Sequence, residues 1–420
     1  MGGHYGWKVG GPLPILGEHS LAKHEIFAEY TRRYIRILSP MLAKPELRLT
    51  IVDGFCGGGA YGFGDGVRPG SPLILLRAVQ AAEVELAAAR RHGFKVHCDF
   101  YFVDRKADHT RHLLEELRRS EFAGRVGRDV HVIEGDFERV APDILSSIQG
   151  RGRSHRSLFF LDQYGWSAVS FAAIRRIFAE LRNPEVLMTF SVDTLINYLT
   201  DQTTRMRAGR RIELDPALGE ALSGMRNERA QRAVIQGFLY RHVLGSTGAD
   251  FYTPFFIRSP RSRRSYWLLH LSRHARARDE MARVHWEKSN AFLHPGKSGF
   301  QALGYDPSID HDQLDLEFDF GSDAHADSIN MAVEQLPRMI HDGSTTTLGA
   351  LFAAHCNETP LTMGMVSEAI VRLRDDLNEI DVLDADGNLR PRATRLDPSD
   401  IVRVAKQRSF LKSLGRRTGR

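Results

Sequence analysis

Short apolar runs alternate with amphipathic segments through the first half of the chain. Five of these runs have the length and the β-branched and aromatic content of buried strands. They lie at residues 47–53, 98–104, 129–136, 157–162 and 185–192. The segments between them space their apolar residues at helical intervals, so strands and helices alternate. This pattern predicts an α/β fold with a doubly wound, mostly parallel Rossmann-like sheet that helices cover on both faces.

Two further strand-like runs, 250–259 and 264–274, flank the turn-like sequence PRSR. They predict an antiparallel hairpin at the end of the sheet, which brings the sheet to seven strands. A long amphipathic helix is expected before the sheet, from about Leu21. We therefore expect an N-terminal helical segment (1–48) and then a Rossmann-like domain (49–300) with a mainly helical insertion at about 193–248.

The last part of the chain has a different composition. Acidic residues dominate from Tyr305 to Asp327, and we interpret 301–335 as an acidic linker. Beyond it, a helix, one or two further helices and a hairpin that turns at Asp386-Gly387 predict a small C-terminal α+β domain over 336–420. A winged helix-turn-helix has this order of elements, and a small helical cap would have it too.

The composition is that of a folded protein without a membrane span. With 42% hydrophobic residues, 420 residues can bury a large core, but no apolar run is long enough to cross a bilayer and the first residues lack a secretory pattern. The three cysteines include no C-x-x-C pair, which argues against disulfides and structural zinc. We expect a cytoplasmic protein without a bound metal.

Basic residues are clustered although the net charge is only +5. The clusters lie at 203–211, 258–264, 272–278 and 403–420. Such clusters can neutralise several phosphates and favour nucleic acid as a partner. A solvated surface or a disordered tail would show the same clustering.

The first strand runs into a glycine-rich break, IVDGFCGGGAYGFG, which indicates a site for a phosphate or a nucleoside. No Gly-Lys-Ser or Gly-Lys-Thr follows the glycines, so a P-loop is excluded. A dinucleotide fingerprint matches formally at Gly57, Gly59 and Gly62. However, the next acid at a strand end, Asp104, lies 47 positions beyond Gly57, and that fingerprint places its acid about 20 residues on.

Acidic residues follow four successive predicted strands: Asp53, Asp104, Asp136 and Asp162. One such acid can be a mere helix cap, but the carboxyl ends of neighbouring parallel strands converge on one crevice. There Asp104 would accept from ribose hydroxyls and Asp136 from an adenine amino group, while Asp53 would orient the loop or a ligand ammonium.

The glycine loop completes this arrangement. Gly57 and Gly59 would admit the amino-acid end of the ligand, and Phe55 is a further candidate for cofactor contact. The whole set resembles the way class I methyltransferases hold S-adenosylmethionine (SAM), and the resemblance spans about Leu49 to His274.

The fourth acid indicates the branch of methyltransferases. Cytosine-C5 enzymes need a Pro-Cys nucleophile here, and the sequence LDQYGW has no cysteine. It looks more like a degenerate D-P-P-Y motif of amino-group methyltransferases. Asp162 would then accept from the target amine and Tyr164 would stack on the base. Gln163 stands in place of a proline, and a loop that only packs the cofactor would also account for this sequence.

The chain resembles most the three-Cys-motif partner protein family (TcmP), which has a methyltransferase-like fold. The resemblance is carried by HSLAKHEIFAEYTRRYI, IVDGFCGGGAY with GSPL, FFLDQYGW and RDEMARVHW, between about His19 and Trp286. It implies a partner protein with a cysteine motif, similar to radical-SAM enzymes. Lys23, on the helix before the sheet, would lie at the mouth of the cofactor site and meet a carboxylate or phosphate there.

These observations favour a SAM-dependent methyltransferase that acts on nucleic acid. A nucleic-acid-binding accessory that kept the fold and lost the chemistry is the alternative, prompted by Gln163. Methylation of a small molecule or a protein is a third hypothesis, in which the basic clusters are incidental.

Overall fold

The computed structural model places two compact units, which are described separately. It describes residues 5–41, 45–90, 93–152, 154–163, 167–191, 211–213, 242–258, 265–288, 293–295, 317–319, 322–342, 346–392 and 394–405. Unit one comprises Met1–Gly296 and Gly304–Phe320, and unit two comprises Lys297–Leu303 and Gly321–Arg420. The candidate site residues all belong to unit one.

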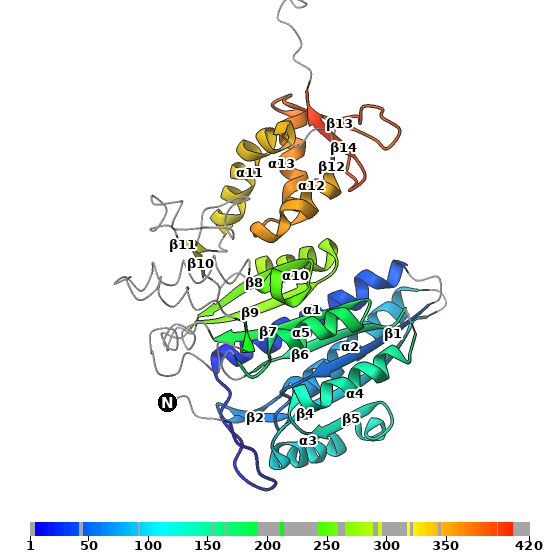
Figure 1. Cartoon of the computed structure of the whole chain (residues 1–420), viewed down its shortest axis with the longest axis vertical. Coiled ribbons are helices and arrows are strands. Elements are labelled where there is room, and N and C mark those ends of the chain that lie inside the picture. The colour runs from blue at the N-terminus through cyan, green and yellow to red at the C-terminus, as the bar shows by residue number, and fades with distance from the viewer. Residues whose placement is uncertain are drawn as a thin grey trace, which may run out of the picture. The chain divides into compact units, whose positions relative to one another are not determined.

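Unit one is built on a seven-stranded sheet (Figure 1). Its strands are β1 (Glu46–Asp53), β4 (Lys95–Asp104), β5 (Val130–Glu134), β6 (Arg156–Leu161), β7 (Pro184–Ser191), β8 (Phe251–Arg258) and β9 (Ser265–Ser272). They lie in the order β5-β4-β1-β6-β7-β9-β8. The first five are parallel to one another, and β9 runs antiparallel to both β7 and β8. The predicted fold class, a mostly parallel seven-stranded sheet with a terminal antiparallel hairpin, is confirmed.

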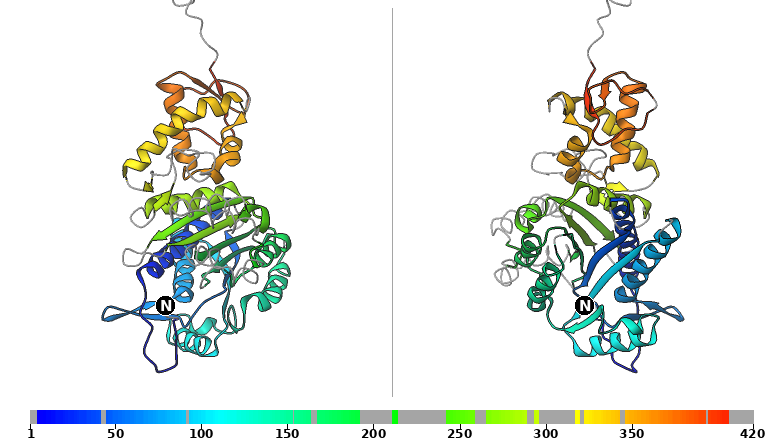
Figure 2. Two further views of the ribbon diagram at one scale, coloured as in Figure 1. Left: turned by 60° about the vertical axis from the view of Figure 1, so that its left-hand side comes forward. Right: turned by 90° about the vertical axis from the view of Figure 1, so that its right-hand side faces the viewer.

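Helices cover both faces of this sheet (Figure 2). They are α1 (Glu18–Leu38), α2 (Ser71–Ala89), α3 (Ala107–Arg119), α4 (Phe137–Gln149), α5 (Phe171–Glu180) and α10 (Ala275–Glu287). Helix α1 packs against α2 and α10, while α4 packs against α5. A short 3-10 turn, η1 (Ser39–Met41), extends α1, and another, η2 (Ala123–Arg125), precedes β5. Two short strands, β10 (Leu293–Pro295) and β11 (Glu317–Asp319), pair antiparallel.

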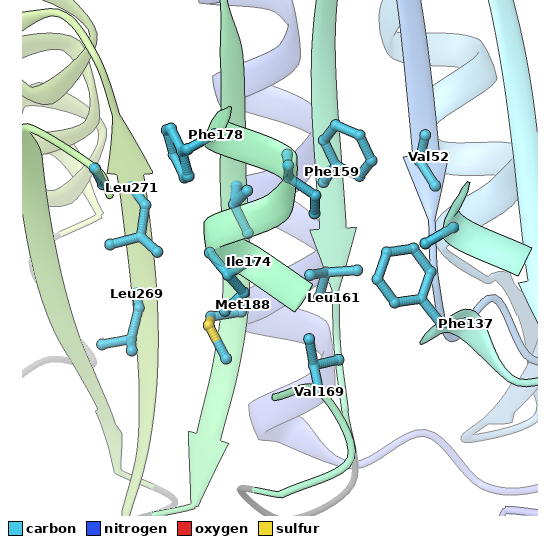
Figure 3. Packing of buried hydrophobic residues seen from close by; sticks show 14 of the residues in the cluster. Val52, Phe137, Phe159, Leu161, Val169, Ile174, Phe178, Met188, Leu269 and Leu271 are labelled. Carbon is cyan, nitrogen blue, oxygen red and sulfur yellow. The ribbon is translucent and has the colours of Figure 1, made fainter. Parts of the chain in front are cut away.

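The core between the sheet and the α4–α5 layer is apolar and fully buried (Figure 3). Val52, Phe159 and Met188 come from three neighbouring strands and pack with Ile174 and Phe178 of α5. Alternate residues of the same strands face the other layer, where Phe160 meets Phe27 of α1 with ring centroids 4.8 Å apart. Strands β6 and β7 are buried on both faces along almost their whole length, so their sequences are mostly apolar instead of alternating.

The structure departs from the prediction after β1. No strands are predicted after the glycine break, but a hairpin of β2 (Ala60–Phe63) and β3 (Gly66–Pro69) lies between the break and α2. Helix α4 begins at Phe137, where the Asp136 side chain caps it by accepting from the Glu138 N–H. Most of the helical insertion expected at about 193–248 lies outside the described residues.

Unit two has the element order of a winged helix. It contains α11 (Ser322–Asp342), β12 (Thr346–Thr347), α12 (Leu348–His355), the 3-10 turn η4 (Cys356–Glu358), α13 (Met363–Asp375), β13 (Ile380–Leu383) and β14 (Ile401–Val404). The three strands form a small sheet in the order β12-β14-β13. Thr347 and Thr362 cap α12 and α13 with their hydroxyl groups, which explains why these helices begin where they do.

Two expectations for this region need correction. The second half of the predicted linker 301–335 is helical, since α11 begins at Ser322, and its acidic residues concealed an amphipathic helix. The chain turns at Gly387 (φ 85°) as expected, but β13 pairs chiefly with β14, well beyond that turn. Within the described residues, no helix is long and apolar enough to cross a membrane.

Candidate active site

The candidate site lies where the sheet changes winding direction. From β1 the chain adds β4 and β5 on one side and β6 and β7 on the other, so β1 and β6 are neighbours at the reversal. Asp53 ends β1 and Asp162 directly follows β6. In open α/β sheets, ligands bind outside the carboxyl ends of the strands at this point.

The glycine loop after β1 is held by backbone hydrogen bonds to both neighbouring strands. The Gly54 N–H donates to the Phe160 carbonyl (2.9 Å), and the Cys56 N–H donates to the Val103 carbonyl (3.0 Å). The loop is therefore fixed across the crevice between β6 and β4. Cys56 itself is buried, which raises the pKa of its thiol and leaves it a packing residue.

Protein side chains occupy the space next to the loop glycines. A Cβ on Gly57 or Gly58 would lie 2.9 or 2.2 Å from the Trp7 indole, and a Cβ on Gly59 would lie 2.7 Å from Leu113. Gly57 and Gly59 also have positive φ, at 60° and 86°. Packing within the chain is thus sufficient to require these glycines, a reason that the sequence pattern did not reveal.

Trp7 is a residue that the sequence reasoning missed. Its indole is buried, donates to the Ala60 carbonyl (2.5 Å) and meets His109 edge to face at 4.8 Å. The segment that carries it pairs with the β2–β3 hairpin, because the Leu16 N–H donates to the Gly62 carbonyl (2.9 Å). The N-terminal segment is therefore part of the wall of the glycine loop.

Asp104 ties this loop to α3. Its Oδ2 accepts from the Gly57 N–H (3.1 Å), its Oδ1 accepts from the Lys106 N–H (2.9 Å), and Nδ1 of His109 lies 3.1 Å from Oδ1. Burial alone would raise the pKa of Asp104, but His109 and the two backbone donors outweigh it and lower the pKa. A carboxylate accepts about four hydrogen bonds, so Oδ2 keeps room for one more donor.

Asp53 is the most deeply buried of the acids, at 1% exposure. Burial raises its pKa to about 7, against hydrogen bonds from Ser71 and from the Phe55 N–H, which donates to Oδ1 (3.1 Å). Its Oδ2 has no hydrogen-bond partner in the described structure. A buried orphan acceptor of this kind is costly and indicates a missing donor.

Asp162 forms an ion pair with Lys23. The Lys23 Nζ donates to both carboxylate oxygens, at 2.6 and 2.7 Å, and the Thr189 hydroxyl donates to Oδ1 at 2.8 Å. Lys23 is 8% and Asp162 24% exposed. Burial opposes ionisation of Asp162, but Lys23 and Thr189 lower its pKa overall, so the carboxylate is charged. The sequence predicted Lys23 as a cofactor-binding residue at the mouth of the site, and in the structure its ammonium binds the Asp162 carboxylate.

Gln163 organises the loop after β6. Its amide nitrogen donates to the Thr189 carbonyl (3.0 Å), and its amide oxygen accepts from the Val169 N–H (2.9 Å). The Thr189 hydroxyl lies 3.1 Å from the Gln163 carbonyl as well. Gln163, which stands in place of a proline of the TcmP-like pattern, thus fixes the turn that carries Asp162.

His24, next to Lys23, is buried and lies near the same carboxylate. Burial lowers its pKa to about 4, Asp162 opposes that shift and Lys23 adds to it. Its Nδ1 has no hydrogen-bond partner among the described residues. A neutral imidazole with an unpaired nitrogen therefore sits beside the Lys23–Asp162 pair, and the sequence did not single it out as a site residue.

The remaining predicted site residues lie further from this centre. Asp136 is exposed and caps α4, although the Gly135 N–H donates to the Asp104 carbonyl and keeps the ends of β4 and β5 adjacent. The ring centroids of Phe55 and Phe137, the latter at the start of α4, lie 6.4 Å apart. Tyr164 lies outside the described residues.

Helix α1 is fixed at its middle by a buried polar group. The Tyr30 hydroxyl donates to Glu185 of β7, and Nε2 of His270 of β9 lies 3.0 Å from the same carboxylate oxygen. Lys23, Phe27 and Tyr30 share one face of the helix because they are four and three residues apart. Anchoring Tyr30 therefore holds Lys23 over the carboxyl end of β6.

The described part of the basic clusters is largely engaged within the protein. Arg278 is fully buried, Arg273 donates to the Phe178 carbonyl, and Arg211 pairs with Glu138 at 2.7 Å. Arg403 pairs with Asp381 at 3.2 Å. These four arginines do not form an open phosphate-binding surface. Most of the other clustered residues lie outside the described part of the chain.

One family model matches part of the chain. The family model of the GMT-like wHTH domain matches residues 304–387. No curated protein matches the chain.

Several solved structures are similar to the chain at low sequence identity. Protein LPL1258 from Legionella pneumophila is 12% identical, with 58% of this chain and 84% of that chain covered at a TM-score of 0.32. Magnesium protoporphyrin IX methyltransferase (ChlM) from Synechocystis with bound SAH is 13% identical, with 59% of this chain and 83% of that chain covered at a TM-score of 0.26. Trm1 from Pyrococcus horikoshii, in complex with SAM, is 10% identical, with 94% and 92% covered at 0.31.

Proposed function

We propose that the chain is a SAM-dependent methyltransferase that acts on an amino group of a nucleic-acid base. The observation that carries the proposal is the gathering of Asp53, Asp104 and Asp162 at the reversal point of the sheet. Asp53 is close enough to both other carboxylates for their charges to raise its pKa, after the larger effect of burial. Such a concentration of acids needs cationic or hydrogen-bond-donating ligand groups to offset its repulsion.

SAM has donors that suit these acceptors. The orphan Oδ2 of Asp53 would accept from its ammonium group, and the remaining site on Oδ2 of Asp104 would accept from a ribose hydroxyl. Asp136 and Phe55, at the ends of β5 and β1, would contact the adenine. When bound, SAM supplies a methyl group on a positively charged sulfur.

On the acceptor side, Asp162 has one acceptor position left on Oδ2, because Lys23 and Thr189 use the other three. The target amine would donate there, and Tyr164 would stack on the base. Gln163 and Thr189 keep the carboxylate in one orientation. Methyl transfer depends mainly on aligning the nucleophile with the methyl group, so few further groups are needed.

The winged helix of unit two supports a nucleic-acid substrate by its fold, but the net negative charge of its described residues disfavours contact with phosphates. Its described residues contain twice as many acidic as basic side chains. On α13, the helix that reads bases in such domains, Arg372 is paired with Glu368 at 2.7 Å. Phosphate contacts would then come from other parts of the chain, such as the basic sequence after β14.

The resemblance to the TcmP family supports a further part of the proposal, a radical-SAM-like partner protein with a cysteine motif. Co-purification of the two proteins at near-equal amounts would support it, and separate elution would argue against it.

A second candidate function is a nucleic-acid-binding accessory without transfer chemistry. The Lys23–Asp162 pair favours it, because the carboxylate that should receive the target amine is already occupied by an ammonium group. The two functions differ in whether label from SAM reaches nucleic acid.

The experiment is incubation of the full chain with methyl-labelled SAM and total DNA or RNA, followed by nucleoside mass spectrometry. The enzyme predicts a methylated base whose label is lost with Asp162→Asn and kept with Asp65→Asn, an exposed position on the β2–β3 turn. Nucleic-acid binding without label identifies the accessory. Label on neither nucleic acid, together with weak binding that is insensitive to salt, would favour a small-molecule or protein substrate.

A further inference from the structure

The Lys23 amine is bound by the same carboxylate that the proposed function assigns to the target amine. Its nitrogen lies 2.6 and 2.7 Å from the two oxygens of Asp162, the carboxylate that follows β6. An amino-group methyltransferase holds its acceptor nitrogen by hydrogen bonds to this acid. The primary amine that the structure shows there belongs to the chain itself.

Lys23 is held in this place by its own helix. Phe27, one turn further along α1, packs on Phe160 of β6, and Tyr30 donates to the buried Glu185. The Lys23 side chain therefore reaches the end of β6 from a fixed backbone. The amine is positioned at the crevice between β1 and β6, where the ligand of such a sheet binds.

From this arrangement we infer that Lys23 is a methylation site of the chain's own active centre, a self-methylated lysine held by Asp162. The inference rests on the SAM-binding part of the proposed function and is independent of the nucleic-acid substrate.

The step balances within the groups at the site. The Lys23 ammonium loses one proton to Oδ2 of Asp162, which accepts its hydrogen bond at 2.7 Å, and the proton then passes to solvent. The freed lone pair of Nζ forms a bond to the methyl carbon of SAM. The bond from that carbon to sulfur breaks, and its electron pair stays on sulfur as the thioether of S-adenosylhomocysteine (SAH). Lys23 is left as a methylammonium that still pairs with Asp162.

The test uses three measurements on the full chain. Calorimetry with SAH first establishes that the cofactor site binds. Mass spectrometry, after digestion with a protease that does not cut at lysine, then reads the state of Lys23 in the protein as purified. The same reading is repeated after incubation with SAM that carries a deuterated methyl group.

The expected result is a methyl group on Lys23 in the purified protein, a deuterated one after incubation, or both. Lys288, whose ammonium pairs with Glu25 on the same helix but lies away from the crevice, is the internal control and stays unmodified. Lys23→Arg keeps a cation opposite Asp162 and should abolish the modification. Asp162→Asn, which no longer holds the amine with two charged oxygens, should reduce it at least tenfold.

Three other outcomes are distinct. If SAH binds and Lys23 is unmodified in both readings, the inference is wrong and the Lys23–Asp162 pair is only a fixed ion pair. If neither SAH nor SAM binds to the folded protein, the proposed function itself fails and this inference fails with it. Equal labelling of Lys23 and Lys288 would also overturn it, because it would mark non-specific chemistry.

Discussion

Lys23 and Asp162, 139 positions apart in the sequence, join helix α1 to the end of β6 through two short hydrogen bonds from one ammonium group. This contact places one ammonium group at the point where the sheet reverses. It joins two segments that are distant in the sequence.

The energy of this pair can be measured with a double-mutant cycle. Lys23→Met should destabilise the fold by about 3 kcal/mol, because it leaves a largely buried carboxylate with the Thr189 hydroxyl as its remaining side-chain donor. The double variant with Asp162→Asn should recover part of that loss. Chemical denaturation is the measurement, and the exposed Lys95–Glu83 pair is the control, expected to contribute less than about 1 kcal/mol. Equal costs for both pairs would refute a buried, coupled interaction.

The Gln163 side chain should stabilise the fold, because it bridges β7 and the segment before α5. Gln163→Leu removes two hydrogen bonds and leaves the Thr189 carbonyl and the Val169 N–H unpaired, at a cost of about 2–3 kcal/mol. Gln149→Leu, which removes a single exposed bond to the Glu180 carbonyl, should cost less than about 0.5 kcal/mol. Thermal and denaturant unfolding of the two variants compares them directly, and similar stabilities would count against the bridge.

Gly58 should tolerate no side chain while Trp7 keeps its place. In Gly58→Ala the new Cβ would lie 2.2 Å from the indole, so Trp7 must move away from the loop and its fluorescence should shift to longer wavelength. Gly66→Ala, in the same region, has no atom closer than 3.8 Å and should leave the spectrum unchanged. Subtracting the spectrum of a Trp7→Phe variant isolates this indole. An unshifted spectrum in Gly58→Ala would show that Trp7 does not pack on the loop.

His24 should make stability depend on pH in a defined direction. Its pKa is lowered to about 4 in the folded chain from 6.5, so the unfolded chain binds more protons between these values. Stability is therefore complete above about pH 6.5 and falls by up to about 3 kcal/mol as the pH drops towards 4.

The difference between wild type and His24→Gln isolates this effect from other groups. The variant should lose less stability than wild type between pH 7 and pH 4.5, as read by urea denaturation. The exposed His97→Gln should follow wild type. If wild type and His24→Gln fall in parallel, His24 is not buried in its neutral form.

The sequence predicted the frame of unit one because its strands are buried on both faces. Runs such as 47–53 and 157–162 are mostly apolar and lack a strict alternation with polar residues, and the order of strands and helices then restricts the topology. The convergence of Asp53, Asp104 and Asp162 followed from the same reasoning, since parallel neighbours end at the same edge.

The contacts that complete the site were beyond prediction from pattern. Which group each acid contacts depends on packing between distant segments: Asp162 accepts from Lys23, and Asp104 accepts from the Gly57 N–H and lies beside His109. The β2–β3 hairpin is only four residues per strand and glycine-rich, so no periodicity marked it. Trp7 lies in a segment without regular structure apart from one bridge at Ile15, and only its contacts reveal its role.

Asp104 and Asp53 carry the central claim that the crevice binds SAM. Calorimetry of SAM with the full chain tests it at pH 6 and pH 7.5. The account predicts that SAM binds and that its affinity rises severalfold between these values, because Asp53, whose burial raises its pKa to about 7, becomes charged. Asp53→Asn should remove that pH dependence, Asp104→Ala should weaken binding at least tenfold, and the exposed Asp65→Asn should match wild type. Absence of SAM binding to the folded protein, or an affinity unchanged by Asp104→Ala, would contradict the assignment of the site.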